Sequence, residues 1–104
     1  MELNNFPDIF QSKLRLMMIS ALVTGKKTFR ELKEITGATD GNISVQITKL
    51  ESVGFITVTK DFHKKRPQTT IAITKKGTHE LLAYIDMLNR IVEQVQNDPF
   101  PPQS

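Results

Sequence analysis

The stretch TFRELKEITGATDGNISVQITKL, residues 28–50, contains two short helical patterns separated by only a few residues. In the first, Thr28 and Glu31 have the spacing of a capping box, in which each side chain bonds the other residue's backbone N–H. Gly37 follows where a left-handed residue commonly ends a helix. Three apolar residues recur at helical spacing and are expected to form the buried stripe: Phe29, Leu32 and Ile35.

The second pattern begins at Thr39, a good helix cap, and ends near Gly54. Its expected buried stripe consists of Ile43, Ile47 and Leu50. Two short helices joined by a tight turn that starts at a glycine are typical of a helix-turn-helix motif. Two residues of the second helix need an explanation. Gly41 is a poor helix former in the first turn, and Val45 lies off the stripe among polar neighbours.

The hydrophobic period changes after Gly54. The segments FITVTK (55–60) and TTIAIT (69–74) alternate and are rich in β-branched residues, which predicts two strands. Between them, DFHKKRPQ (61–68) is too polar and too basic to belong to a core. The pattern therefore predicts a β-hairpin whose strands are joined by a basic loop.

Helical patterns also precede and follow this region. The first predicted helix runs from Pro7 to Val23, and the last runs over 75–96 with Thr74 as its cap. The last helix has a long apolar stripe: Leu81, Tyr84, Ile85, Met87, Leu88, Ile91, Val92 and Val95. The Pro-rich segment 97–104 is expected to be a disordered tail. Residues 1–104 thus predict one mainly α domain with a small β-hairpin, of the α+β class.

Composition narrows the possible functions. The 104 residues contain no cysteine, which excludes disulfides and thiolate metal sites and favours a cytoplasmic protein. No segment approaches the roughly 20 apolar residues of a membrane span, and the first ten residues do not resemble a signal peptide. The net charge is +3, but residues 60–76 alone carry +5 and the remainder carries −2. Such a cluster fits a polyanionic partner, although a solvated lysine-rich loop fits equally well.

The order helix, helix, helix, hairpin, helix resembles the winged-helix family of bacterial transcriptional regulators of the MarR and ArsR type. The resemblance covers roughly residues 9–95 and rests on three segments: SKLRLMMISAL (12–22), FRELKEITGATDGNISVQITKLESVGFI (29–56) and KKRPQTTIAITKKG (64–77). It implies a winged helix-turn-helix with helix 40–53 in the DNA major groove and a basic wing, 61–68, on the backbone or minor groove. It also implies transcriptional regulation, with repression by promoter occlusion as the expected mode.

The chain departs from the family pattern in three ways. The cysteine ligands of ArsR-type metal sensors are absent. Val45 stands where many MarR-type proteins carry arginine, and Lys33 stands where many helix-turn-helix motifs carry a small residue. Thiolate metal sensing and a guanine contact at position 45 therefore do not carry over.

Placing the buried stripe of the second helix inward turns small, polar side chains outward. Asn42 and Gln46 have the groups to pair with adenine, and Ser44 and Lys49 can reach phosphate or guanine. Val45 can meet a thymine methyl group. The expected DNA contacts are Thr39, Asn42, Ser44, Val45, Gln46, Thr48, Lys49, Lys64, Lys65 and Arg66. The plainer alternative is a solvated amphipathic helix.

The last helix favours a homodimer. At 1.5 Å per residue it would be roughly 33 Å long, whereas a domain of this size has a radius of gyration near 13 Å. Its distal apolar residues need cover, either from a second copy together with Phe6 and Phe10 or from the first helix of the same chain. The expected dimer interface is Tyr84, Leu88, Ile91, Val92 and Val95. A two-fold dimer would place two recognition helices about 34 Å apart, in successive major grooves.

Other functional classes remain as alternatives. The main one is a winged-helix adaptor that binds an acidic protein through its basic hairpin without specific DNA binding. RNA binding is disfavoured because the pattern predicts no surface aromatics for base stacking. No arrangement typical of an enzyme occurs, and the isolated His63 and His79 do not indicate a metal site or other cofactor. A small-molecule effector is unknown; a pocket between the first and last helices and a solid core there are equally compatible with the sequence.

Overall fold

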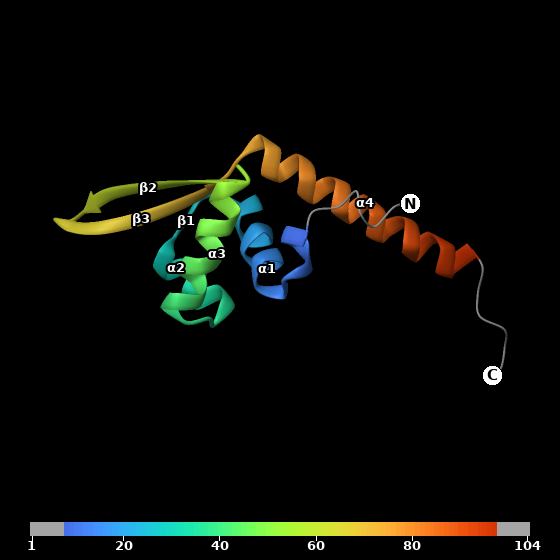
Figure 1. Cartoon of the computed structure of the whole chain (residues 1–104), viewed down its shortest axis with the longest axis horizontal. Helices are drawn as coiled ribbons and strands as arrows, with labels where there is room; N and C mark the ends of the chain where they lie inside the picture. The colour runs from blue at the N-terminus through green and yellow to red at the C-terminus, as the bar shows by residue number, and fades with distance from the viewer. Residues whose placement is uncertain (1–7, 98–104) are drawn as a thin grey trace.

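The computed structural model describes residues 8–97 and has the predicted order of elements (Figure 1). Its helices are η2 (Asp8–Gln11, a 3₁₀ helix), α1 (Lys13–Val23), α2 (Phe29–Thr36), α3 (Asp40–Ser52) and α4 (Lys75–Asn97). Its strands are β1 (Lys27–Thr28), β2 (Ile56–His63) and β3 (Arg66–Ile73), which form an antiparallel sheet of order β1-β3-β2. The predicted α+β class, with a winged helix-turn-helix and an added C-terminal helix, is confirmed.

The start of the first helix differs from the prediction. Helix α1 begins at Lys13 because Ser12 caps it: the Ser12 hydroxyl oxygen accepts the Arg15 N–H at 3.2 Å. The preceding turn is the separate helix η2, and Pro7 lies outside the described residues. Strand β1 was not predicted, because two residues are too few to show a period.

The predicted capping of α2 is confirmed. The Thr28 N–H donates to the Glu31 carboxylate at 2.9 Å, and the Glu31 N–H donates to the Thr28 hydroxyl oxygen at 3.0 Å. The bond from the Thr28 backbone is the main reason that the pKa of Glu31 is lowered. Gly37 ends the helix with φ 72°, as expected for a left-handed cap.

One member of the predicted α2 stripe is wrong. Leu32 is fully buried and Phe29 is half-buried, but Ile35 is 48% exposed. At 100° per residue, Phe29 and Thr36 lie on one side of Leu32 and Ile35 lies on the other. The core packs against the first side, where Thr36 is half-buried, so Ile35 is left at the surface.

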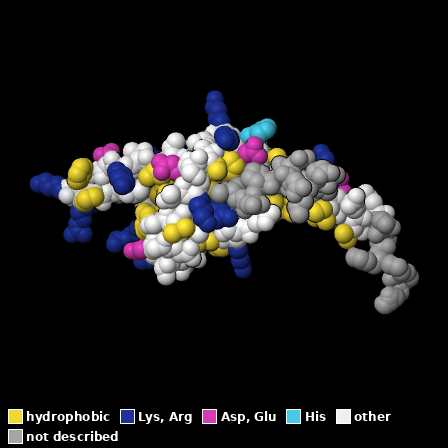
Figure 2. Space-filling view, viewed as in Figure 1, with side chains coloured by type: hydrophobic (Ala, Val, Ile, Leu, Met, Phe, Trp, Pro, Cys, Tyr) yellow, Lys and Arg dark blue, Asp and Glu magenta, His cyan; other side chains and the backbone are white. Residues whose placement is uncertain are grey.

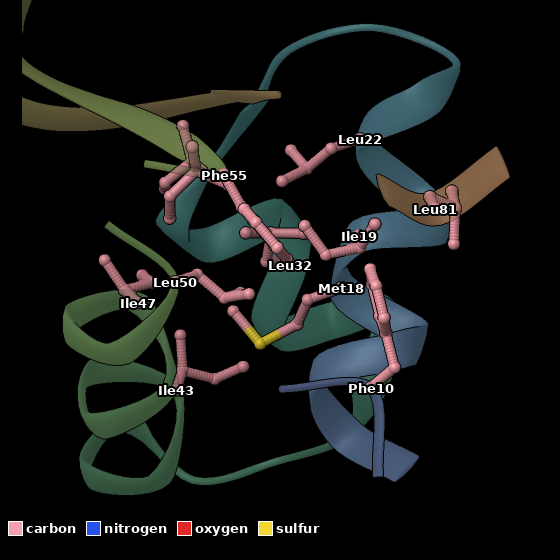
Figure 3. Packing of buried hydrophobic residues seen from close by; sticks show 12 residues of the cluster. Phe10, Met18, Ile19, Leu22, Leu32, Ile43, Ile47, Leu50, Phe55 and Leu81 are labelled. Atoms are coloured by element: carbon pink, nitrogen blue, oxygen red, sulfur yellow. The ribbon is translucent and has the colours of Figure 1, made fainter. Parts of the chain in front are cut away.

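The core lies between α1, α2, α3 and the base of the sheet (Figure 3). The predicted stripe of α3 is confirmed, since its side chains are all buried: Ile43, Ile47 and Leu50. Ile43 and Leu50 point toward Met18 and Leu32 from the facing helices. This packing fixes which side of α3 faces solvent.

Phe10 belongs to this core and not to a surface that could cover a second subunit. Its ring is 2% exposed and stacks on Phe55 at 5.6 Å and on Tyr84 at 5.0 Å between ring centroids. The predicted share of Phe10 in a dimer interface is therefore wrong, and Phe6 lies outside the described residues. The same stacking fills the region between the first and last helices with side chains, where a pocket was one of two alternatives.

The hairpin is more regular than predicted. Segment 61–68 is not a loop: strand pairing continues through Phe62 with Pro67 and His63 with Arg66. Only Lys64 and Lys65 form the turn, with φ of 53° and 66°. These angles match the two-residue hairpin turns whose twist suits the flanking strands.

Helix α4 is joined firmly to the domain at its start. The Thr74 N–H donates to the Phe55 carbonyl at 3.0 Å, and the Thr74 hydroxyl donates to the Gly54 carbonyl at 2.6 Å. The predicted cap is confirmed, because Gly77 N–H donates to the Thr74 hydroxyl oxygen at 3.0 Å.

The rest of α4 leaves the domain (Figure 1). Leu81 is buried in the core and Met87 is also buried, whereas the apolar residues further along are exposed: Leu88, Ile91, Val92 and Val95. The longest principal extent is 63 Å and the radius of gyration is 17.0 Å, well above the roughly 13 Å of a compact chain of this length. The predicted overhang of this helix is present.

Candidate nucleic-acid interface

The outward face of α3 consists of small side chains with hydrogen-bonding groups. Exposed on it are Gly41, Asn42, Ser44, Val45, Thr48, Lys49 and Ser52. Among them Val45 is a large apolar side chain that is 50% exposed. Only Lys49 in this set carries a charge, so the face can approach another surface closely.

Two of these hydroxyl groups are already oriented by the helix. The Thr48 hydroxyl donates to the Ser44 carbonyl at 3.0 Å, and the Ser52 hydroxyl donates to the Lys49 carbonyl at 2.7 Å. Each hydroxyl oxygen therefore presents its lone pairs outward and acts as an acceptor. Thr39 caps the helix, its oxygen accepting the Asn42 N–H at 3.2 Å.

Gln46, one of the expected DNA contacts, is buried instead of exposed on this face. It is 9% exposed, because it lies only about 40° from Leu50 around the helix at 100° per residue. Its side-chain oxygen accepts from Nη1 of Arg15 at 2.7 Å, and its nitrogen donates to the Asn42 oxygen at 3.2 Å. The amide predicted to pair with adenine is thus committed to two protein partners.

Lys33 connects the two helices of the helix-turn-helix. Its ammonium lies 2.6 Å from a carboxylate oxygen of Asp40, and both side chains are exposed. Asp40 occupies the first turn of α3, where a negative charge interacts favourably with the helix dipole. The ion pair gives a physical reason for the lysine that departs from the family pattern, and it leaves little net charge at the start of α3.

Within residues 8–97, no contact requires a glycine at position 41. A Cβ built at this position would meet no atom within 4 Å. The described part of the protein therefore gives no steric reason for a residue without a side chain here. A close approach by a partner would give one.

The wing brings cations and an aromatic ring to the free end of the hairpin. Lys64, Lys65 and Arg66 are exposed at the turn, and Figure 2 shows dark-blue and yellow surface together there. Phe62, on β2, is 73% exposed and pairs across the strands with Pro67. The expectation that the surface lacks aromatic side chains is wrong at Phe62. Strand alternation on an uncovered hairpin could have indicated it.

An open groove of about 450 Å³ separates the wing from the start of α2. Its lining includes Arg30, His63 and Arg66 together with the polar Gln68 and Thr69. The groove extends the cationic surface from the wing toward the helices.

Within residues 8–97, no group of three histidine, aspartate or glutamate side chains could hold a metal ion. No helix in that range is both long enough and apolar enough to cross a membrane.

A helix-turn-helix with an exposed polar second helix, followed by a basic hairpin, defines the class of winged-helix domains. The family model described as winged helix DNA-binding domain matches residues 14–92. The chain belongs to this family, and its fold is that of MarR-like transcriptional regulators.

One protein sequence and two solved structures are similar to the chain over most of its length. An uncharacterised protein of Methanocaldococcus jannaschii is 34% identical over 90 residues, which cover 85% of this chain and 97% of that protein. The solved structure of a transcriptional regulator homologue from Pyrococcus horikoshii is similar with a TM-score of 0.75 at 27% identity, covering 84% of this chain and 87% of that one. A structure from Enterococcus faecalis described as MarR-family has a TM-score of 0.70 at 20% identity, covering 86% and 81%.

Proposed function

We propose that the protein is a cytoplasmic, non-enzymatic, homodimeric regulator that binds a specific double-stranded DNA site and represses by occluding a promoter. The observation that supports it best is the exposed face of α3 standing beside a cationic wing in a winged-helix DNA-binding chain. A major groove about 12 Å wide admits an α-helix with small outward side chains. The wing then supplies sequence-independent attraction to phosphates.

In this complex the first turn of α3 lies nearest the bases. Gly41 lets the backbone approach the groove, and Val45 contacts a thymine methyl group. Ser44, Thr48 and Lys49 contact phosphates or base edges. The free amides near Thr39 and Asp40 bind a phosphate at the helix start, where both residues are exposed.

The wing contacts the backbone and an adjacent minor groove. Lys64 and Lys65 neutralise phosphates, while the weaker hydration of Arg66 suits a narrow minor groove. Phe62 adds an exposed ring beside these cations. Apolar side chains in this setting can insert between base steps of the minor groove.

The uncovered half of α4 supports the proposed homodimer. Four exposed apolar residues lie on the same side of the helix as the buried Leu81: Leu88, Ile91, Val92 and Val95. A two-fold arrangement would pair this stripe with itself. Tyr84 also packs on Phe10 within its own chain, so its share in the interface is smaller than that of the four exposed residues.

The first test is binding to random duplex DNA at low salt, followed by selection from a random duplex pool. A DNA-binding regulator is expected to bind the random duplex and to enrich a roughly palindromic sequence. Half-sites should lie about one helical turn, or a multiple of it, apart. A protein-interaction adaptor need not bind duplex DNA, so failure to bind at low salt would reject the proposal.

Replacing Val92 by aspartate is expected to convert the dimer to a monomer. Two aspartates would face one another in an apolar interface, where an unpaired charge is costly. Sedimentation equilibrium measures the mass, and Gln94→Glu is the matched control because it adds the same charge on the polar side of α4. An unchanged dimeric mass for Val92→Asp would place the interface elsewhere, and a monomeric wild type would exclude the dimer.

A further inference from the structure

Three polar side chains connect α1 to the exposed face of α3. Nη1 of the half-buried Arg15 donates to Oε1 of Gln46 at 2.7 Å, and Nε2 of Gln46 donates to Oδ1 of Asn42 at 3.2 Å. Gln46 is almost fully buried, whereas Asn42 is exposed in the first turn of α3. The chain of bonds therefore runs from the domain interior to the surface that faces DNA in the proposed complex.

The direction of these bonds is fixed by the chemistry of arginine. A guanidinium group can only donate hydrogen bonds, so the amide oxygen of Gln46 must face Arg15. The Gln46 nitrogen must then face Asn42, and only the oxygen of Asn42 can accept from it. The reverse orientation would bring two donors together at 2.7 Å. Arg15 thus determines where the oxygen and the nitrogen of the Gln46 and Asn42 amides lie, although the two ends of an amide have nearly the same shape.

The Asn42 nitrogen is left as the group available to a partner. No described residue accepts a hydrogen bond from it. An Asn42 held in this way cannot pair bidentately with adenine, because that pairing needs its oxygen as well. It can donate to the acceptors of guanine, N7 and O6, but it meets only a donor at cytosine N4.

We propose that Arg15 is a positioning residue for base recognition: acting through Gln46, it makes Asn42 a donor that favours guanine and disfavours cytosine at one base pair of the binding site. This inference rests on the proposed function, since it concerns the same face of α3. The adenine contacts expected for Asn42 and Gln46 are then absent, and a single base contact remains, in which the Asn42 nitrogen donates. Arg15 itself contacts no base in this scheme.

The test uses selection and competition with duplexes that differ at single base pairs. The relevant pair is the one whose preference is lost in Asn42→Ala. Wild type is expected to favour guanine over cytosine there by about tenfold, within the range of a good side-chain–base contact. Arg15→Lys keeps a donor and should retain the preference. Arg15→Met removes the donor, lets both amides rotate, and should reduce the preference to about threefold or less.

Further variants separate the possible failures. Arg15 is half-buried, so Arg15→Met can fold poorly, which circular dichroism would show. Arg15→Gln is therefore a second variant. Its amide can donate or accept, so it does not fix the orientation of Gln46, and the same loss of guanine preference is expected. Asn42→Asp presents an acceptor outward and should reverse the preference toward cytosine. An unchanged guanine preference in folded Arg15→Met and Arg15→Gln would overturn the role of Arg15. Absence of any base preference at Asn42 would overturn the contact, whereas absence of wild-type DNA binding would reject the proposed function instead.

Discussion

Replacing Gly77 by alanine is expected to lower the free energy of unfolding by about 3 kcal/mol, at the upper end of the usual cost of overpacking a core. A Cβ at this position would overlap the carbonyl oxygen of Phe55 and lie 3.0 Å from Cγ1 of Ile73. The carbonyl cannot easily move, because it accepts the Thr74 N–H that attaches α4 to the domain. Relief of the overlap therefore requires α4 to shift away from the core.

Urea unfolding at matched protein concentration measures this loss, and matched concentration matters because dimerisation adds to the apparent stability. Gly41→Ala is the matched control, because it is also a glycine-to-alanine substitution in the first turn of a helix. It adds a Cβ in open space, so stability should stay the same or rise by roughly 0.5 kcal/mol from better helix propensity. Unfolding curves that coincide for wild type and Gly77→Ala would show that α4 accommodates the methyl group, and the tight junction described above would be wrong.

The two glycines show what a sequence can and cannot predict. Gly41 stood out because it is a poor helix former at the start of a good helix. Gly77 did not stand out, because the need for glycine at this position comes from the carbonyl group of Phe55, a residue 22 positions earlier. Contacts of that kind depend on how elements pack, and no local period encodes them.

The candidate site likewise combines features that a local pattern predicts with features that depend on how the elements pack. The stripe of Ile43, Ile47 and Leu50 was enough to predict which side of α3 is outward. Gln46 was misplaced because a polar residue beside an apolar stripe can be buried when a partner satisfies it, and Arg15 is that partner from another helix. Wing residues were predicted by charge, but the exposure of Phe62 depended on how far the hairpin extends beyond the helices.

The wing turn has a conformation that its lysines do not favour. Lys64 and Lys65 both have positive φ, where a residue with a Cβ costs about 1–2 kcal/mol. Asn-Gly is the preferred sequence for two-residue turns with these angles. Strained turns of this kind are informative, because the side chains kept there are expected to serve a function that offsets the strain.

The double variant Lys64→Asn, Lys65→Gly should therefore make the protein more stable, by about 1 kcal/mol, while weakening its binding to DNA. Loss of two phosphate contacts per wing, four in the proposed dimer, should make the slope of log K against log salt shallower by about 3.6, and lower the affinity roughly 1,000-fold at 0.1 M salt. Filter binding or fluorescence anisotropy across a salt series measures both quantities, and thermal unfolding measures the stability.

A rise in stability together with a fall in affinity would exclude unfolding as the cause of weaker binding, which an alanine scan of the turn would not do. Arg90→Gln is a suitable control, since it removes a cation from the exposed part of α4 that is paired with Asp86 and lies away from the wing. Its salt slope should match wild type. If the double variant also keeps the wild-type slope, Lys64 and Lys65 do not contact phosphates, and the strain at the turn must be offset by something other than DNA.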